Sequence, residues 1–223
     1  MGRILSLAIV GAIAVTTMGG CCAPDRNGSI AATEPVKWEE PFMLHEAKLP
    51  DGFPEAGPVG EVIVKTYPPC RLATVAGADL PGKGQDRMFM PLFNHIQKEK
   101  ISMTSPVVMD FAATPADAAP LPPIAMSFVY GNEQIGQTGK DGIVRIHDLP
   151  AMTVLSVGVR GSYDGKNFDN GMSAINQWLA SHPKTYTVVR TPRFLGYNSP
   201  FVPWFLRFGE VQVPVERVGM GDG

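Results

Sequence analysis

The chain has 223 residues, enough for one domain of ordinary size with extensions or at most two small ones. Its formal net charge is −2 and only 18% of its residues are charged, so it lacks the basic surface of a nucleic-acid-binding protein. The 24 glycines and 21 prolines favour short strands joined by many turns and argue against a helical bundle.

The N-terminus has the features of an export signal. Arg3 supplies the positive end, and residues 4–18 form a mostly apolar run, shorter than the roughly 20 residues of a membrane-spanning helix. Two glycines directly before Cys21 resemble a bacterial lipoprotein signal, in which the cysteine is lipidated after cleavage. We predict a signal peptide over 1–20, lipidation of Cys21 and a membrane-anchored protein of the cell envelope, on the periplasmic side or at the surface. Plain secretion and a retained anchor are the alternatives.

The cysteine content excludes a disulfide framework, because Cys21, Cys22 and Cys70 are the only three. If Cys21 carries lipid, Cys22 and Cys70 could pair, but Cys22 would then sit at the membrane surface. We expect Cys70 to be a small buried thiol. No Cys-x-x-Cys-His run or zinc-type spacing occurs, which excludes covalent haem attachment and gives no reason to expect a zinc site.

Residues 21–58 are rich in proline, glycine and acidic side chains and predict a tether that docks in part on the domain. The domain itself is expected over 59–218, followed by a flexible tail at 219–223. Short apolar runs between turn residues predict strands at 61–67, 70–77, 105–111, 124–130, 143–148, 151–160, 185–191 and 206–213.

Two stretches have helical periodicity. The first begins at Asp86, a good N-cap residue, and ends near 98. Its apolar positions are Met88, Phe89, Leu92, Phe93 and Ile96. The second covers 167–181, where the apolar positions are Phe168, Met172, Ile175, Trp178 and Leu179.

The order of elements repeats along the chain. "YPPCRLATVAG" and "LPAMTVLSVGVRG" lie about eighty residues apart, and each contains a strand that ends in glycine and precedes a loop and an amphipathic helix. Two βαββ repeats predict an α+β fold: a distorted, eight-stranded, mostly antiparallel β-barrel with two helices packed on it. A barrel of eight strands has room for packed side chains or one small ligand.

Several stretches together resemble the SOUL haem-binding protein family. They are "YPPCRLATVA", "FMPLFNHIQKEKISMTSPV", "MSFVY", "AMTVLSVGVRG" and "YNSPFVPWFLRFGEVQVPV", in family order. The resemblance implies the same repeated barrel and reversible, non-covalent binding of haem or a related tetrapyrrole. A histidine proposed as axial ligand in certain animal members lies just before the position matching Tyr67. Thr66 stands there, so that ligation does not carry over.

The helix at 86–98 is the first candidate wall for a flat ligand. The predicted apolar wall consists of Met88, Phe89, Leu92, Phe93, Met103, Phe201 and Trp204. The same residues also suit ordinary core or turn positions, and that alternative stays open. Glu210 alternates with valines and is expected to face solvent unless Gly209 forms a bulge.

Polar residues of the same helix have two interpretations each. His95 is either a half-exposed boundary residue or an axial ligand of haem iron. Arg87, Lys98 and Lys100 either form a solvated helix surface or contact haem propionates. No metal other than haem iron is expected.

We expect a carrier, buffer or scavenger of haem or a related tetrapyrrole at the bacterial cell envelope. The first alternative is a module that binds other flat hydrophobic molecules without iron ligation. The second is an enzyme acting on tetrapyrroles or small electrophiles. The sequence shows no nucleophile elbow, phosphate loop or carboxylate pair, so we expect no catalysis. We further expect a monomer that reaches the membrane through its N-terminal lipid and binds no nucleic acid.

Overall fold

A large antiparallel sheet organises the chain. The computed structural model describes residues 41–81, 86–112 and 122–218; the predicted signal peptide, Cys21 and the C-terminal tail lie outside them. The first half contains β1 (Val62–Tyr67), β2 (Cys70–Ala76), η1 (Gly77–Asp79), α1 (Asp86–Lys98), β3 (Val107–Asp110), β4 (Ala125–Val129) and β5 (Gly139–Asp141). The second contains β6 (Val144–Leu149), β7 (Met152–Arg160), α2 (Gly165–Ser181), β8 (Tyr186–Val188), β9 (Arg193–Gly196), η2 (Trp204–Leu206) and β10 (Phe208–Arg217).

The sheet confirms the repeat. Its strands follow the order β1-β7-β10-β9-β3-β4-β2-β6-β5, with β8 paired to β10. The eight strands from β1 to β6 are symmetric about the β9–β3 pair. Each strand of the first repeat has its counterpart from the second repeat at the mirrored position: β1 and β6, β2 and β7, β3 and β9, β4 and β10. The first strand of each repeat therefore pairs with the second strand of the other, and β3 meets β9 at the centre.

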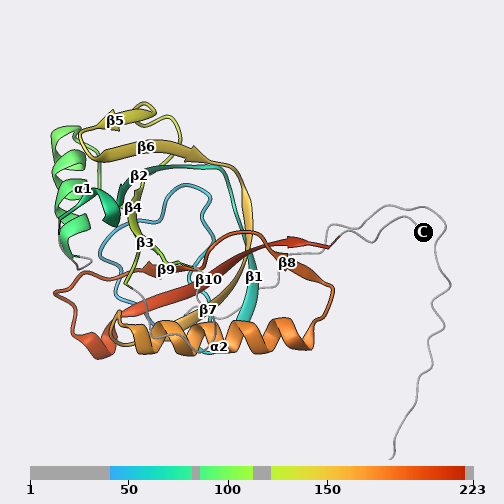
Figure 1. The fold of residues 1–223 in the computed structure, drawn as a ribbon. Coiled ribbons are helices and arrows are strands. Elements are labelled where there is room, and N and C mark those ends of the chain that lie inside the picture. The colour runs from blue at the N-terminus through green and yellow to red at the C-terminus, as the bar shows by residue number, and fades with distance from the viewer. Residues whose placement is uncertain (1–40, 82–85, 113–121, 219–223) are drawn as a thin grey trace, which may run out of the picture. The chain divides into compact units, whose positions relative to one another are not determined.

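The α+β class, the antiparallel pairing and the two helices agree with the sequence prediction, but a closed eight-stranded barrel is not confirmed. The sheet has ten strands in the described part of the chain. Its path ends at β1 on one side and at β5 on the other, so it is strongly curved but open (Figure 1).

Both helices cover the same face of the sheet and share one hydrophobic core. α1 lies on β2 and β4, and α2 lies on β7 and β10 (Figure 1). α2 approaches β10 so closely that a Cβ on Gly171 would lie 2.4 Å from Val211, and glycine is therefore required there. Asp164 caps α2 by accepting a hydrogen bond from the Asn167 amide at 3.0 Å.

Residues 41–58, which we call the strap, lie against the opposite face. Met43, Leu49, Phe53 and Ala56 pack into a second core on that side of the sheet. The Gly158 amide donates to the Pro58 carbonyl at 3.0 Å. A Cβ on Gly158 would lie 2.5 Å from that carbonyl oxygen, so only glycine lets the strap come this close.

A buried ion pair lies between the strap and the sheet. Lys65 of β1 and Glu210 of β10 are 2.5 Å apart, and both side chains are fully buried. Glu210 was expected to face solvent, and that expectation is wrong. The alternation along β10 is real, but α2 covers one of its faces and the strap covers the other.

Other expectations about the fold are also resolved. Cys70 is a buried free thiol, as predicted. Among the described residues, no helix is both long enough and apolar enough to span a bilayer.

Replacing Lys65 by Met should lower the free energy of unfolding by about 3–5 kcal/mol, because it leaves the Glu210 carboxylate buried without its cation. Urea unfolding measures this. Adding Glu210→Gln should recover part of the loss, since the amide keeps an acceptor and removes the charge. Lys98→Met, at an exposed ion pair, should change stability little; an equal effect of the two lysine substitutions would contradict the account.

Candidate functional site

The helix α1 presents two kinds of apolar residue. Met88 and Leu92 are buried against the sheet and belong to the core. Phe89 and Phe93 are half-buried at the edge of that core, with their rings stacked at 5.9 Å. The Phe89 ring also meets the edge of Phe128 at 5.2 Å. The two phenylalanines therefore form a flat apolar surface that is partly open to solvent.

Further residues extend this surface. Met90 is 52% exposed on the same helix. With 100° per residue, Met90 and Phe93 lie about 60° apart around the helix axis. Met103, which follows the helix, is half-buried in the same hydrophobic cluster. We call Phe89, Met90, Phe93 and Met103 the α1 flank.

The structure does not bring every predicted wall residue together. Met88, Phe89, Leu92, Phe93 and Met103 belong to one cluster. Phe201 and Trp204 lie on the connection between β9 and β10 and are not part of that cluster; they are 95% and 62% exposed. Their role in ligand binding stays a prediction.

His95 lies on the other side of α1 and is held by two hydrogen bonds. Its Nδ1 is 2.8 Å from Oδ2 of Asp141, and its Nε2 is 2.7 Å from the hydroxyl of Tyr130. A carboxylate only accepts, so Nδ1 donates to Asp141; when the ring is neutral, Nε2 accepts from the Tyr130 hydroxyl. We call His95, Tyr130 and Asp141 the α1 clasp, since it ties the end of the helix to β4 and β5.

Charge reinforces the clasp. Lys98 donates to Oδ1 of Asp141 at 2.9 Å. The hydrogen bond from His95, followed by that from Lys98, lowers the pKa of Asp141 below its ordinary value. Burial raises the pKa of Tyr130 to about 12, so its hydroxyl keeps its proton at neutral pH.

The geometry separates His95 from the α1 flank. Phe93 and His95 lie about 160° apart around the helix axis, at 100° per residue. A flat ligand on the flank would therefore not present its centre to the imidazole. An iron bond to His95 would also require Nε2 to give up Tyr130.

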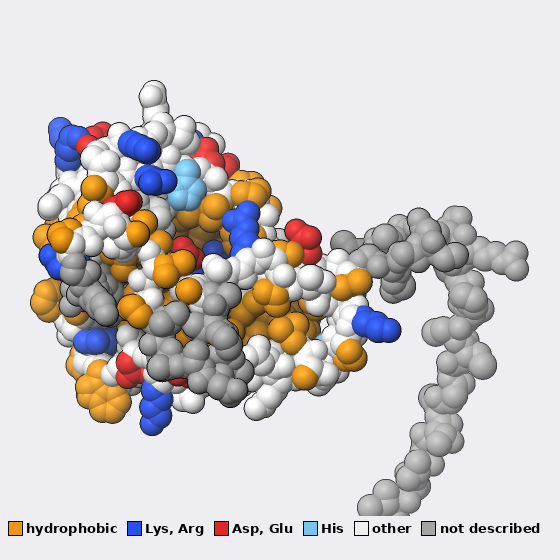
Figure 2. All heavy atoms as spheres, in the orientation of Figure 1, with side chains coloured by type: hydrophobic (Ala, Val, Ile, Leu, Met, Phe, Trp, Pro, Cys, Tyr) orange, Lys and Arg blue, Asp and Glu red, His pale blue; other side chains and the backbone are white. Residues whose placement is uncertain are grey.

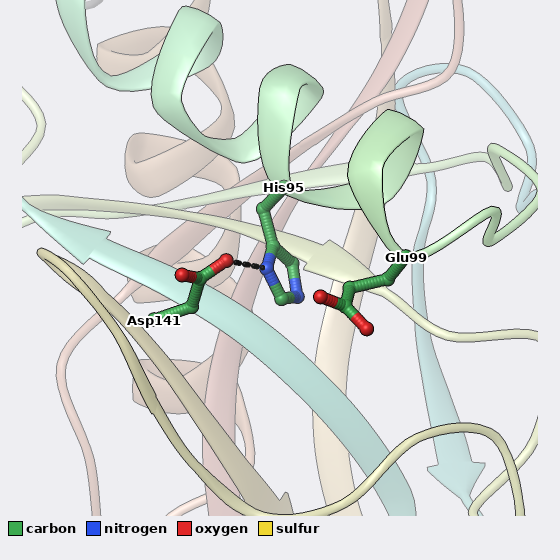
Figure 3. A group of neighbouring side chains, drawn as sticks. All are labelled: His95, Glu99 and Asp141. Carbon is green, nitrogen blue, oxygen red and sulfur yellow. Dashed lines mark hydrogen bonds and ion pairs between the residues drawn. The ribbon is translucent and has the colours of Figure 1, made fainter.

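Glu99 completes a group of possible metal ligands with His95 and Asp141, whose donor atoms lie within 4.8 Å of one another. Figure 3 shows the imidazole between the two carboxylates, with Asp141 on the Nδ1 side. Both ring nitrogens and the Asp141 carboxylate already have protein partners. The group is explained by the clasp without a metal ion.

The predicted propionate contacts are spread over the length of α1. Arg87 is exposed near its start, and Lys98 and Lys100 are exposed at its end. Arg87 and Lys98 are separated by about 16 Å along the axis, at 1.5 Å per residue. Lys98 is engaged in the clasp, while Lys100 follows the helix with a left-handed φ of 54°.

A polar network that sequence reasoning missed fills the space under the strap. Glu210 accepts hydrogen bonds from Lys65, the Gly57 amide, Ser156, Tyr197 and Gln212. Gln212 in turn accepts from Arg193 at 2.8 Å and donates to Tyr67 at 2.8 Å.

Desolvation acts on the groups of this network. Burial lowers the pKa of Lys65, and the carboxylate of Glu210 opposes that shift. Burial raises the pKa of Tyr197 well above its ordinary value. No buried side-chain nitrogen or oxygen among the described residues lacks a partner, so each polar atom of the network already has a hydrogen bond within the protein.

The sequence carried one signal for this network. Lys65 alternates with Tyr67 in an otherwise apolar strand, and Glu210 alternates with Gln212 in another. Two opposite charges at inward positions of separate strands can be read as a buried pair.

A shallow groove of about 510 Å³ runs along the strap. It is lined by His45, Glu46, Ala47, Lys48, Leu49 and Glu55. None of the predicted site residues is among them.

Comparison with known sequences decides the family. Residues 59–214, more than half of the chain, match the sequence profile of SOUL heme-binding proteins. The chain belongs to the SOUL haem-binding family. The strap lies just before the matched residues, so the segment that covers the Lys65–Glu210 pair is not part of the SOUL match. A search of curated proteins gave no match.

Solved structures similar to this SOUL-family chain support the fold alone, because their sequence identity is low. The C-terminal domain of EcmrR has a TM-score of 0.53 and 16% identity, over 71% of this chain and 98% of that chain. A hydrolase from Listeria innocua has a TM-score of 0.52 and 10% identity, over 72% and 94%. An uncharacterized conserved protein from Listeria innocua has a TM-score of 0.54 and 10% identity, over 71% and 94%.

Thr66 stands where certain animal members have the proposed histidine ligand, so this position offers no histidine for haem iron. Thr66 lies in β1, paired with Thr153 of β7, and its side chain is exposed. A threonine hydroxyl is not among the usual axial ligands of haem iron.

Replacing His95 by Ala should leave the Soret band and the haem affinity unchanged within about twofold, because His95 faces away from the α1 flank. Alanine is the best helix former, so α1 itself should persist. The same variant should unfold at lower urea, since it deletes both bonds of the clasp. Loss of a low-spin haem spectrum in His95→Ala would show instead that His95 ligates the iron.

Proposed function

We propose that this protein binds haem or a related tetrapyrrole reversibly on the α1 flank. The observation that carries the proposal is the SOUL family match over residues 59–214. The site is chosen because the flank is apolar, flat and partly exposed, whereas the interior under the strap is filled by a satisfied polar network.

The chemistry of the flank fits a porphyrin face. Two stacked phenylalanine rings offer a flat platform, and the thioethers of Met90 and Met103 adapt to irregular surfaces. Removing apolar area from water contributes about 25 cal/mol per Å², so an area of about 300 Å² would contribute about 7 kcal/mol without any iron bond. Propionate contacts would come from one end of the helix, either from Arg87 or from Lys98 and Lys100, because the two ends are about 16 Å apart.

The role we assign is that of a carrier, buffer or scavenger in the bacterial cell envelope, acting by binding and without turnover. A lipid on Cys21 would anchor it to the membrane, and a monomer would suffice for binding. The rival is a module for other flat hydrophobic molecules, and it is favoured by one observation: both nitrogens of His95 already have protein partners. A hydrolase is among the proteins that share the fold, but at 10% identity it lends no support to an activity here.

Titration with ferric haem tests the proposal. A saturable change in the Soret region at one haem per chain is expected. Met90→Ser should weaken the affinity about fivefold or more, since complete burial of a methionine side chain contributes about 1.5–3 kcal/mol.

The matched control is Val188→Ser on β8, where the valine is comparably exposed, and its affinity should equal that of the parent. An unchanged haem spectrum, with saturable binding of metal-free hydrophobic dyes, would favour the rival module. Equal losses of haem affinity in Met90→Ser and Val188→Ser would show that the α1 flank is not the binding site.

The location is tested separately by replacing Cys21 with Ser and fractionating bacteria that express the chain. The parent should pellet with membranes and the variant should be released, because a serine cannot receive the lipid. A variant that pellets like the parent would contradict lipid anchoring at Cys21.

A further inference from the structure

The connection between β9 and β10 exposes an unusual amount of aromatic surface. Phe201 is 95% exposed, Trp204 62% and Phe205 55%. Trp204 and Phe205 lie edge to face at 5.8 Å, so their rings form one projecting group. Exposed apolar patches of this kind on soluble domains mark sites of contact with proteins or membranes.

This connection is held in a fixed shape from below. The Arg207 guanidinium donates to the carbonyls of Val202 at 2.8 Å and Pro200 at 2.6 Å. Asn198 accepts a hydrogen bond from the Phe208 amide at 2.8 Å, which joins the two ends of the connection. These hydrogen bonds therefore fix the conformation of the turn that carries the aromatic side chains.

The start of the strap lies against the same connection. Arg160 donates to the carbonyls of Phe42 at 2.5 Å and Leu206 at 3.3 Å. Asn198 donates to the Leu44 carbonyl at 2.7 Å. Phe42 is itself 70% exposed. We call Phe42, Phe201, Trp204 and Phe205 the aromatic edge.

Figure 1 shows the orange-red helical turn of this connection at the lower left margin of the fold, beyond the N-terminal end of α2. Hydrophobic side chains reach the surface at that margin in the same view (Figure 2).

The charges beside the aromatic edge favour an anionic surface. Within the described part of the chain, neither Arg160 nor Arg207 forms an ion pair with a carboxylate. The nearby Glu46 accepts from the amide and the hydroxyl of Ser199, each at 2.7 Å, and keeps its negative charge, so two guanidinium charges outweigh one carboxylate charge here.

The chain also connects this edge to the predicted lipid. Cys21 and Pro41 are separated by a link of 19 residues. A chain segment spans at most about 3.4 Å per residue, so a lipid on Cys21 would keep the aromatic edge within about 70 Å of the bilayer.

We propose that the aromatic edge lies on a phospholipid bilayer. Its rings enter the boundary between headgroups and acyl chains, where tryptophan and phenylalanine are favoured, and Arg160 and Arg207 face the phosphates. The inference rests on the cell-envelope location given under the proposed function. It adds a second membrane contact, which orients the domain.

Vesicle flotation tests this with the chain from Cys22 onward, which keeps every described residue and carries no lipid. The probe is a vesicle of phosphatidylethanolamine and phosphatidylglycerol. The parent should float with the vesicles, and Phe201→Ser combined with Trp204→Ser should reduce its partitioning about tenfold or more. Both side chains are mostly exposed, so the double variant should fold like the parent.

Met90→Ser is the matched control, because Met90 is also exposed but lies on the α1 flank. It should float like the parent while losing haem affinity, and the double variant should show the reverse. Equal flotation of parent and double variant would overturn the proposal, as would a parent that does not float. A double variant that loses haem affinity but still floats would also overturn it, and would assign Phe201 and Trp204 to the ligand wall. Because no lipid is attached, a failure of the Cys21 prediction cannot produce any of these results.

Discussion

The buried ion pair between Lys65 and Glu210 constrains the rest of the structure. Two charges removed from water are tolerated only when each is fully hydrogen-bonded, and here the bonds come from five separate parts of the chain. One of these parts is the strap, whose Gly57 amide binds Glu210 and whose Glu55 carbonyl accepts from Lys65. The pair therefore fixes the strap over the sheet, and the polar network fills the space beneath the strap.

Because the space under the strap is filled, we propose that the ligand binds on the helix face. On the helix face of the sheet, the two sides of α1 have different roles. On one side, the clasp of His95, Tyr130 and Asp141 fastens the helix to β4 and β5. On the other, phenylalanine and methionine side chains form a half-open apolar surface. A histidine that looked like an iron ligand in the sequence thus has a structural role, and the binding that we propose relies on hydrophobic contact with the porphyrin.

The elements with a clear period could be predicted from the sequence. Both helices and most strands were predicted, because their apolar residues recur with a period of about 3.6 residues in helices or 2 residues in strands. β9 was missed because all four of its residues are buried and show no alternation, and β5 because it is short and polar. The burial of Glu210 was missed for another reason: alternation separates two faces of a strand but does not tell whether a distant segment covers the second face. The open edges of the sheet depend likewise on pairings between distant strands.

The central claim is that a porphyrin binds on the α1 flank and not under the strap. Its most direct test is the amide NMR spectrum of the chain during addition of zinc protoporphyrin, a diamagnetic haem analogue. We predict that the largest shift changes fall on residues 89–93 and on Met103, while the amides of Lys65, Glu210 and Gln212 stay unchanged. Changes concentrated in the strap and around Glu210 would contradict the account, because they would show that the ion pair opens to admit the ligand.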